Sequence, residues 1–481
     1  MKTIQYELSN GIATLTFDEP NSSVNTMCLQ WQADLTEATA QIVKDKDAIS
    51  GIVLASNKST FFAGADLKGL MRNKATDAGA IFTEIERMKK NFRTLETLGK
   101  PVVSCLNGAA LGGGWEVALV GHYRVAVDDQ KIQFGMPEVS LGLIPGASGI
   151  TKTTRLLGLM GAQPYLLEGK LFKPREGLDL GLIHELVANE GDVAAALRCA
   201  ALTWIAANPV SAQPWDNKDY KIPGGTPTNP KIAMALTVAP AMMNKASRGL
   251  YPAPEAALAA MVEGAMVDFD TALRIESRYL ARLAVDPIAK NMINTFFFNM
   301  NAVKSEQRRQ TQTDANQADR KPKLSDCLSP QARDRIASAY QNEGQKLLND
   351  GIPLAVIHNA NHQCGMTVTL TLPAPSDQPT SDKPTIAWNI QDIKDRLLYR
   401  QAVETARCLS EDVLTTVHDA NIGSIFGIGF PAYTGGAMQF IYGMGVDAFV
   451  KRAAELATQF GPGFALTDTV KAAILQHQPQ Y

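Results

Sequence analysis

The first part of the chain alternates short apolar runs with amphipathic segments up to about residue 190. Between the first two runs, Cys28, Trp31, Leu35, Ala38 and Ile42 recur at three- and four-residue intervals, which predicts a helix with one apolar face. The apolar runs have the length of buried strands and span residues 11–17, 51–56, 101–107 and 123–127. Strands that alternate with helices are typical of an α/β domain.

The pattern changes near residue 190, where the strand-like runs disappear. Residues 194–207 are rich in Ala and Leu, and a second apolar stripe at helical spacing runs through residues 287–304. Residues 213–230 form a turn-rich loop with several Pro and Gly residues. We therefore expect an α/β core over residues 1–190, followed by a helical extension and linker helix over residues 191–305.

Two polar stretches divide the rest of the chain. Residues 310–323 hold no large apolar side chain, so we expect residues 306–334 to be an exposed connector. A second connector, residues 373–384, is rich in Pro, Ser, Asp and Thr. Beyond it, apolar positions between Ile393 and Leu409 recur at helical spacing, so residues 335–481 are expected to be a helical C-terminal region.

The composition fits a soluble globular protein. The 481 residues, 45% hydrophobic and 20% charged, suit two or three domains. Because 46 basic residues oppose 48 acidic ones, the chain has no footprint for nucleic acid or an anionic membrane. The sequence contains no integral membrane segment and no signal peptide at its first residues, and its six cysteines lack paired spacing. We expect a cytoplasmic protein.

The densest chemical signal is a glycine-rich segment at residues 107–119. Gly112, Gly113 and Gly114 lead from an apolar run into a predicted helix, and Glu116 lies in its first turn. Unpaired amides at a helix start lie at the positive end of the helix dipole and suit a developing oxyanion. A tight turn that needs glycine for steric reasons explains the glycines equally well.

A second carboxylate, Glu138, follows Glu116 after 22 residues, in a turn that contains Pro137. No helical spacing relates the two residues, so only the fold can bring them together. Paired carboxylates can divide general-acid and general-base work when their environments separate their pKa values. Taken singly, each glutamate is most simply a solvated surface residue.

Three motifs in order resemble the enoyl-CoA hydratase/isomerase (crotonase) superfamily. They are Phe62-Ala63-Gly64-Ala65-Asp66, Ala110-Leu111-Gly112-Gly113-Gly114-x-Glu116, and Pro137-Glu138-Val139-x-Leu141-Gly142-Leu143-x-Pro145-Gly146. The resemblance implies a crotonase-like ββα spiral domain and an acyl-CoA substrate. It implies hydration of trans-2-enoyl-CoA to 3-hydroxyacyl-CoA in fatty-acid β-oxidation, with Δ3,Δ2-enoyl-CoA isomerisation as a side activity.

The resemblance also implies roles for individual residues. Glu116 would deprotonate the attacking water and Glu138 would protonate Cα, while the amides of Ala65 and Gly113 would form the oxyanion hole. The backbone of Ala63, Asp66 and Leu67 would lie along CoA. Phe296 and Phe297 would line the acyl tunnel, with core packing as the alternative for both.

The resemblance extends to the α-subunits of bacterial fatty-acid oxidation complexes. Residues 142–186 and the helix at 287–304 match that family, and parts of residues 340–436 resemble the C-terminal domains of its 3-hydroxyacyl-CoA dehydrogenase. We expect the NAD-binding Rossmann domain to have no counterpart, because the chain contains no Gly-x-Gly-x-x-Gly. The expectation is therefore no NAD binding, no dehydrogenase activity and no other cofactor.

Two features of the sequence bear on functions other than hydration. His358, His362 and Cys364 have spacing that mimics a metal site but lack an obvious fourth ligand, so no metal is expected. The competing hypothesis is a non-catalytic docking subunit that binds a thiolase or a second copy of itself. Glu116, Glu138 and the glycine motifs favour an enzyme, because a scaffold needs neither carboxylate.

Overall fold

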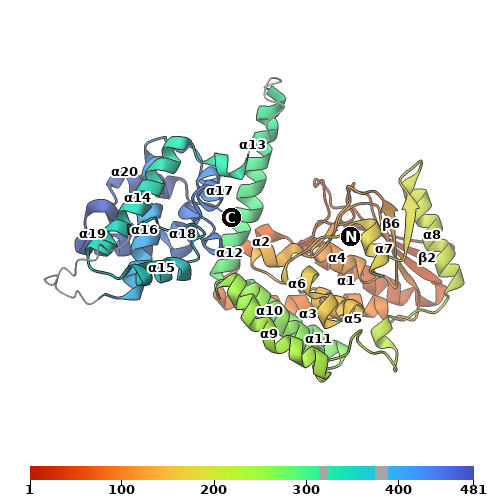
Figure 1. Ribbon diagram of the computed structural model, residues 1–481. Helices are drawn as coiled ribbons and strands as arrows, with labels where there is room; N and C mark the ends of the chain where they lie inside the picture. The colour runs from red at the N-terminus through yellow and green to blue at the C-terminus, as the bar shows by residue number, and fades with distance from the viewer. Residues whose placement is uncertain (314–322, 374–387, 481) are drawn as a thin grey trace. The chain divides into compact units, whose positions relative to one another are not determined.

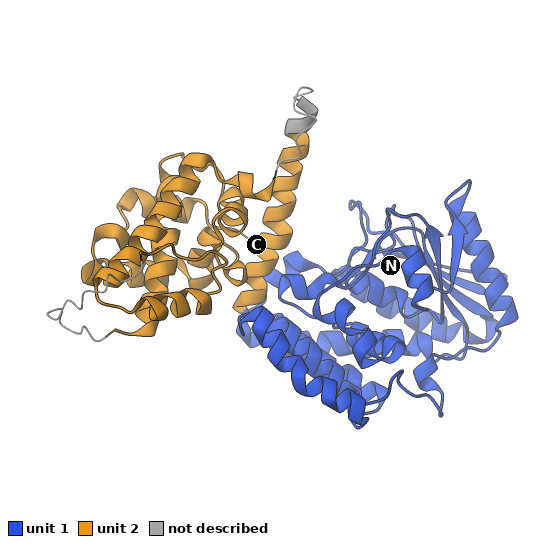
Figure 2. Ribbon diagram, in the orientation of Figure 1, with its two compact units in different colours: residues 1–286 blue, residues 287–481 orange. Residues whose placement is uncertain are grey.

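The computed structural model describes residues 1–313, 323–373 and 388–480. The chain divides into two compact units, residues 1–286 and residues 287–481 (Figure 2). This division falls inside segment 191–305, at the start of the linker helix expected over residues 287–304. The reason is that the helices before residue 286 pack onto the α/β core, whereas the helix that begins at Pro287 belongs to the second unit.

A six-stranded sheet forms the centre of the first unit (Figure 1). Its strands, in spatial order, are β1 (Ile4–Ser9), β2 (Ile12–Phe17), β3 (Gly51–Ser56), β4 (Val102–Leu106), β6 (Tyr123–Asp128) and β8 (Glu185–Ala188). Only β1 and β2 pair antiparallel. The four predicted apolar runs are confirmed as β2, β3, β4 and β6, which are nearly continuous in apolar residues because parallel strands are covered on both faces.

Helices cover both faces of this sheet. They are α1 (Leu29–Lys44), α2 (Leu67–Met71), α3 (Ala78–Glu96), α4 (Gly113–Ala118), α5 (Gly149–Gly161), α6 (Gln163–Leu167), α7 (Pro174–Asp179) and α8 (Val193–Ala207). On one face, Leu197 and Ile205 of α8 pack against strand residues such as Val103. On the other, Trp31 of α1 lies against Phe17 and Phe62, with ring centroids 6.1 and 5.1 Å apart. The predicted apolar stripe of α1 is therefore confirmed.

Three further helices complete the first unit: α9 (Pro230–Ser247), α10 (Pro252–Gly264) and α11 (Phe269–Leu283), with α10 lying beside both others (Figure 1). The loop before them contains one short 3₁₀ turn, Pro214–Asp216. α11 packs against α3 and α5, so it reaches the α/β core although it lies far away in the sequence.

The second unit is helical throughout its described residues. It comprises α12 (Pro287–Ile293), a π-helical turn (Asn294–Asn299), α13 (Met300–Thr313), a 3₁₀ turn (Leu324–Cys327), α14 (Pro330–Asn349), α15 (Leu354–Gln363), α16 (Ile390–Ser410), α17 (Val417–Ile428), α18 (Ala437–Met444), α19 (Val446–Phe460) and α20 (Asp468–Gln476). α16 is its centre and contacts α14, α18 and α20. The expected all-α C-terminal region is confirmed.

The predicted connectors are shorter than expected where the structure describes them. α13 continues to Thr313 and α14 begins at Pro330, so both ends of the segment 306–334 are helical. Polar residues such as Gln, Arg and Glu are good helix formers and need no apolar stripe to extend an exposed helix. The central part of this segment, and nearly all of the connector at 373–384, lie outside the described residues. Within the described ranges, no helix is both long and apolar enough to cross a bilayer.

A buried ion pair joins α5 and α3 in the first unit. Lys152 of α5 and Glu96 at the end of α3 have side chains with no exposed surface, and Lys152 Nζ contacts Glu96 Oε1 directly. Lys152 also donates to the carbonyl of Leu119 at 3.2 Å, and Arg93 donates to Glu96 Oε2 at 2.8 Å. Burying a charge away from water costs free energy unless the charge has a partner. The ion pair therefore holds α5 against α3.

We predict that Glu96→Gln lowers the free energy of unfolding by about 3 to 5 kcal/mol, because it leaves Lys152 as a buried charge without its counter-ion. Urea denaturation measures this change. The matched control is Glu176→Gln, which removes the same charge from the exposed Lys170–Glu176 pair and should leave stability almost unchanged. Equal effects of the two substitutions would contradict the importance of the buried pair.

Candidate functional site

A cavity of about 330 Å³ in the first unit contains both predicted carboxylates, Glu116 and Glu138. Ala65 and Gly113 lie beside them in its wall. Most of the remaining wall is apolar and includes Met27, Leu70, Ile81, Ile85, Met88, Leu143, Ile144 and Leu280. The cavity therefore joins a small polar end to an extended apolar surface.

A short parallel sheet brings the two carboxylates together. β5 (Ala110–Leu111) pairs with β7 (Phe134–Gly135), and the amide of Gly112 donates to the carbonyl of Gly135 at 2.8 Å. The chain enters α4 directly after β5 and a 3₁₀ turn (Pro137–Leu141) shortly after β7. Glu116 and Glu138 therefore reach one cavity despite the 22 residues between them.

Glu116 is bound by the backbone that leads into α5. Its Oε1 accepts hydrogen bonds from the amides of Ala147 and Gly149 at 2.7 and 2.6 Å, and only 3% of the residue is exposed. Oε2 accepts none from the described residues. Burial, and next the negative charge of Glu276, raise the pKa of Glu116 to about 7, against the opposing effect of the two amides. Near neutral pH the carboxylate can therefore both accept and release a proton.

Glu138 lies in a different electrostatic environment. Its Oε2 is buried and has no hydrogen-bond partner among the described residues. Burial, followed by the charge of Glu116, raises the pKa of Glu138 well above the usual range for a carboxyl group. Among the described residues, no amide of another residue binds Glu138, in contrast to Glu116. This difference favours a protonated Glu138 beside an ionisable Glu116.

Two backbone amides in the same wall lack acceptors. Gly113 is the first residue of α4 and so has no intrahelical acceptor for its N–H. Within the described parts of the chain, the amides of Gly113 and Ala65 donate no hydrogen bond. A Cβ atom on Gly113 would lie 2.7 Å from the sulfur of Met27 and 3.6 Å from the nitrogen of Ala65. An added Cβ would therefore lie too close to the Met27 sulfur, whereas its distance from the Ala65 nitrogen is an ordinary van der Waals contact.

The other predicted substrate contacts differ among themselves. Asp66 lines the cavity, but its Oδ1 accepts from the amide of Gly69 at 3.0 Å and so caps α2. Ala63 and Leu67 are absent from the cavity wall. Phe296 and Phe297 belong to the π-helical turn of the second unit, whose position relative to the cavity is not determined. Their proposed role in an acyl tunnel stays a prediction.

A third carboxylate, Glu276, lies next to the site and was not predicted from the sequence. Glu276 of α11 is completely buried and forms an ion pair of 2.9 Å with Lys89 of α3. A signal did exist, because Phe269, Leu273, Glu276 and Leu280 follow helical spacing. Glu276 therefore lies on the apolar face of its own helix. A charged residue on an apolar helix face is buried only when it is paired, so this position could have identified Glu276 as a paired carboxylate.

Other clusters and cavities lie in the second unit. Among the described residues, Glu306, His418 and Asp419 are the one group of potential metal ligands with donor atoms within 4.8 Å of one another, and the predicted candidates His358, His362 and Cys364 form no such group. The Nε2 of His418 lies 3.0 Å from Glu306 Oε1, so an ion pair or hydrogen bond accounts for that contact.

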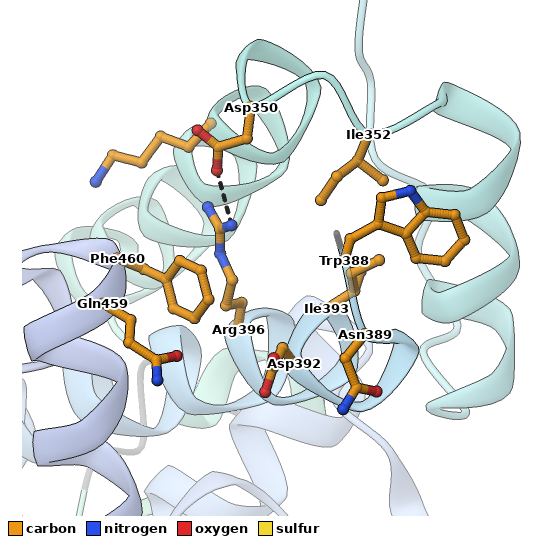
Figure 3. Close-up of a pocket in the computed structure, with 10 residues that line it drawn as sticks. Asp350, Ile352, Trp388, Asn389, Asp392, Ile393, Arg396, Gln459 and Phe460 are labelled. Atoms are coloured by element: carbon orange, nitrogen blue, oxygen red, sulfur yellow. Dashed lines mark hydrogen bonds and ion pairs between the residues drawn. The ribbon is translucent and has the colours of Figure 1, made fainter. Parts of the chain in front are cut away.

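A separate cavity of about 350 Å³ surrounds Arg396 (Figure 3). Its guanidinium binds Glu343 and Asp350 at 2.6 and 2.8 Å and lies 4.4 Å from the ring centre of Phe460. Because Glu343 and Asp350 already neutralise the charge of Arg396, this guanidinium does not indicate a site for an anionic ligand.

The family comparison agrees with the fold and the site. The family model described as enoyl-CoA hydratase/isomerase matches residues 7–216. This region contains the parallel sheet, both carboxylates and the two amides without acceptors. Residues 7–216 are therefore similar to the enoyl-CoA hydratase/isomerase family.

Curated relatives extend this similarity. The chain is 31% identical over 294 residues to the fatty acid oxidation complex subunit alpha of Shewanella loihica, and 34% identical over 290 residues to that of Shewanella baltica. Each match covers 60% of this chain and 40% of the relative, so the chain spans less than half the length of these proteins. A crystal structure of enoyl-CoA hydratase from Bacillus anthracis, 21% identical, covers 58% of this chain and 89% of its own, with a TM-score of 0.38.

We predict that Gly112→Ala destabilises the first unit by about 2 kcal/mol or more. Gly112 has a φ of 57° and a ψ of −130°, and an added Cβ would lie 2.7 Å from Oε1 of Glu138. The control is Gly181→Ala, because Gly181 has a φ of 69° but no atom near its added Cβ. Urea denaturation compares the two variants. An effect of Gly112→Ala no larger than that of Gly181→Ala would show that contact with Glu138 does not require glycine.

Proposed function

We propose that the chain catalyses the hydration of a trans-2-enoyl-CoA to the corresponding 3-hydroxyacyl-CoA. The proposal rests on one observation. Two carboxylates and two amides that have no acceptor among the described residues line the same cavity. These are the groups needed to polarise a thioester carbonyl and to add the elements of water to the adjacent double bond. The apolar remainder of the cavity suits an acyl chain.

In this mechanism the amides of Ala65 and Gly113 donate to the thioester oxygen. Negative charge develops on that oxygen when a nucleophile attacks Cβ, and fixed donors stabilise it without having to reorient. The position of Gly113 at the start of α4 adds the favourable end of the helix dipole, although α4 is short. The double bond thereby becomes electrophilic at Cβ.

The two carboxylates then divide the proton transfers. Glu116 accepts a proton from water as the water oxygen bonds to Cβ, and Glu138 donates its proton to Cα. The raised pKa of Glu138 keeps that carboxyl protonated, whereas the pKa of Glu116, about 7, leaves a large ionised fraction at neutral pH. Exchange with solvent restores both groups for the next turnover. A Δ3,Δ2 shift of the double bond is proposed as a side activity, with Glu138 moving a proton between Cα and Cγ.

A role in fatty-acid β-oxidation is supported by the similarity to the fatty acid oxidation complex subunits alpha. Because the chain spans only 40% of those proteins, their further activities and assemblies do not transfer with the match. The absence of NAD binding and of dehydrogenase activity, and association with a thiolase, stay predictions from the sequence. A docking subunit remains the competing hypothesis, and it requires neither carboxylate.

We predict that Glu116→Gln lowers kcat for the hydration of crotonyl-CoA by about a hundredfold or more, because glutamine cannot take a proton from water. Chromatographic quantification of 3-hydroxybutyryl-CoA measures the product directly. The control Glu176→Gln alters an exposed carboxylate and should retain full activity. Near-normal turnover by Glu116→Gln would refute the assigned base, and inactivity of the unmodified chain would favour the docking hypothesis.

A pH dependence follows from the same assignment. Since the base must be ionised, kcat/KM should rise with pH and level off above about 7, where Glu116 has lost its proton. At still higher pH it should fall as Glu138, whose pKa is also raised, loses the proton it must donate. Steady-state rates with crotonyl-CoA across this range give the profile. A kcat/KM that does not decrease on the acid side of pH 7 would contradict an ionised Glu116 as the base.

A further inference from the structure

The segment that binds Glu116 also binds the buried carboxylate of α11. Glu276 Oε1 accepts from the amide of Ser148 at 2.7 Å, and its Oε2 accepts from both the amide and the hydroxyl of Thr151 at 2.8 Å. Ser148 lies between the two residues whose amides donate to Glu116. Successive amides of residues 147–149 thus alternate between Glu116 and Glu276, and one segment joins the two carboxylates.

Lys89 also binds Glu276. Its Nζ lies 2.9 Å from Glu276 Oε1 and also donates to the carbonyl of Leu273 and the hydroxyl of Ser277, at 2.7 and 2.9 Å. Lys89 is only 2% exposed and Glu276 is fully buried. A buried pair with this many hydrogen bonds has one well-defined geometry, because any departure leaves a charge unpaired.

The backbone between the two carboxylates is strained. Ser148 has a φ of 98°, a backbone conformation that residues other than glycine rarely adopt. Such a conformation persists only where surrounding contacts determine it. The hydrogen bond from the amide of Ser148 to Glu276 is one such contact, and its neighbours on both sides bond to Glu116.

We propose that Glu276, paired with Lys89, is a positioning residue for Glu116. It holds residues 147–151 so that the amides of Ala147 and Gly149 bind one oxygen of Glu116 and leave the other for water. Glu276 does not line the cavity, so it acts through the backbone and through its charge. This inference rests on the proposed hydratase function for its catalytic consequence, but its structural part does not.

The charges around Glu116 determine how its titration should respond. Glu276 on α11 and Glu138 on the turn after β7 oppose its ionisation, whereas Lys89 on α3 and Lys152 on α5 favour it. Glutamine at position 276 would remove one negative charge and retain Lys89. The ionised form of Glu116 would then be easier to reach, and its pKa would fall.

The test compares Glu276→Gln with the unmodified chain and with Asp270→Asn, a control at an exposed position of the same helix. We expect Glu276→Gln to lower kcat for crotonyl-CoA at least about tenfold with little change in KM, and to move the acid limb of kcat/KM to lower pH. Asp270→Asn should change neither quantity. A variant that merely contained less folded protein would keep the pH profile of the unmodified chain once rates are scaled to active sites. A folded Glu276→Gln with unchanged kcat and acid limb would overturn the proposal.

Hydrogen exchange separates this proposal from the proposed function. The amides of Ala147 and Gly149 bond Glu116 and not Glu276, so faster exchange at these amides in Glu276→Gln reports displacement of the segment even if the chain has no hydratase activity. Unchanged exchange there would overturn the positioning role.

Milder variants decide the matter if Glu276→Gln does not fold. Thr151→Val removes one hydrogen bond to Glu276, whereas Thr151→Ser keeps the hydroxyl. We expect faster exchange at Ala147 and Gly149 in Thr151→Val and exchange close to that of the unmodified chain in Thr151→Ser. Identical exchange in the two variants would contradict the proposal.

Discussion

The candidate site depends on one interaction, the binding of two buried carboxylates by the backbone amides at the start of α5. Glu116 and Glu276 come from elements 160 positions apart in the sequence, and residues 147–151 join them with hydrogen bonds of 2.6 to 2.8 Å. Because backbone amides carry no net charge, they bind the carboxylates without introducing a competing charge. Lys89 then balances the negative charge next to Glu116.

The α/β architecture supplies the rest of the geometry through backbone rather than side chains. The pairing of β5 with β7 brings Glu116 and Glu138 to one cavity, and glycine at position 112 lets the chain approach Glu138 closely. The two carboxyl groups differ because the amides of Ala147 and Gly149 stabilise the Glu116 anion, whereas burial and the charge of Glu116 raise the pKa of Glu138 well above its usual range. Acid and base roles therefore follow from the environment of chemically identical side chains.

Much of this arrangement could be predicted from the sequence, since strands, glycine turns and the helical stripes leave local patterns. Glu116, Glu138 and the amides of Ala65 and Gly113 lie together in the cavity, as the motifs predicted. Glu276 could not be paired with them beforehand, because its partners Ser148 and Lys89 are distant in sequence and two of its contacts are to backbone. The roles assigned to Ala63 and Leu67 also left no local pattern, and neither residue lines the cavity.

The division of the chain was similarly hard to predict. Polar composition suggested a boundary after residue 305, yet the units separate at residue 287 and α13 continues to Thr313. Helix boundaries depend on local propensity, whereas unit boundaries depend on which distant surfaces are packed together. Only the packing of α10 and α11 on α3 and α5 assigns those helices to the first unit.

The central claim is that this cavity adds water across the double bond of an enoyl thioester. Its most direct test is to incubate the unmodified chain with crotonyl-CoA in deuterated water enriched in oxygen-18, and to analyse the product by mass spectrometry. The account predicts 3-hydroxybutyryl-CoA with one oxygen-18 at C3 and one deuterium at C2. Recovery of crotonyl-CoA without any labelled hydroxyacyl product would contradict it.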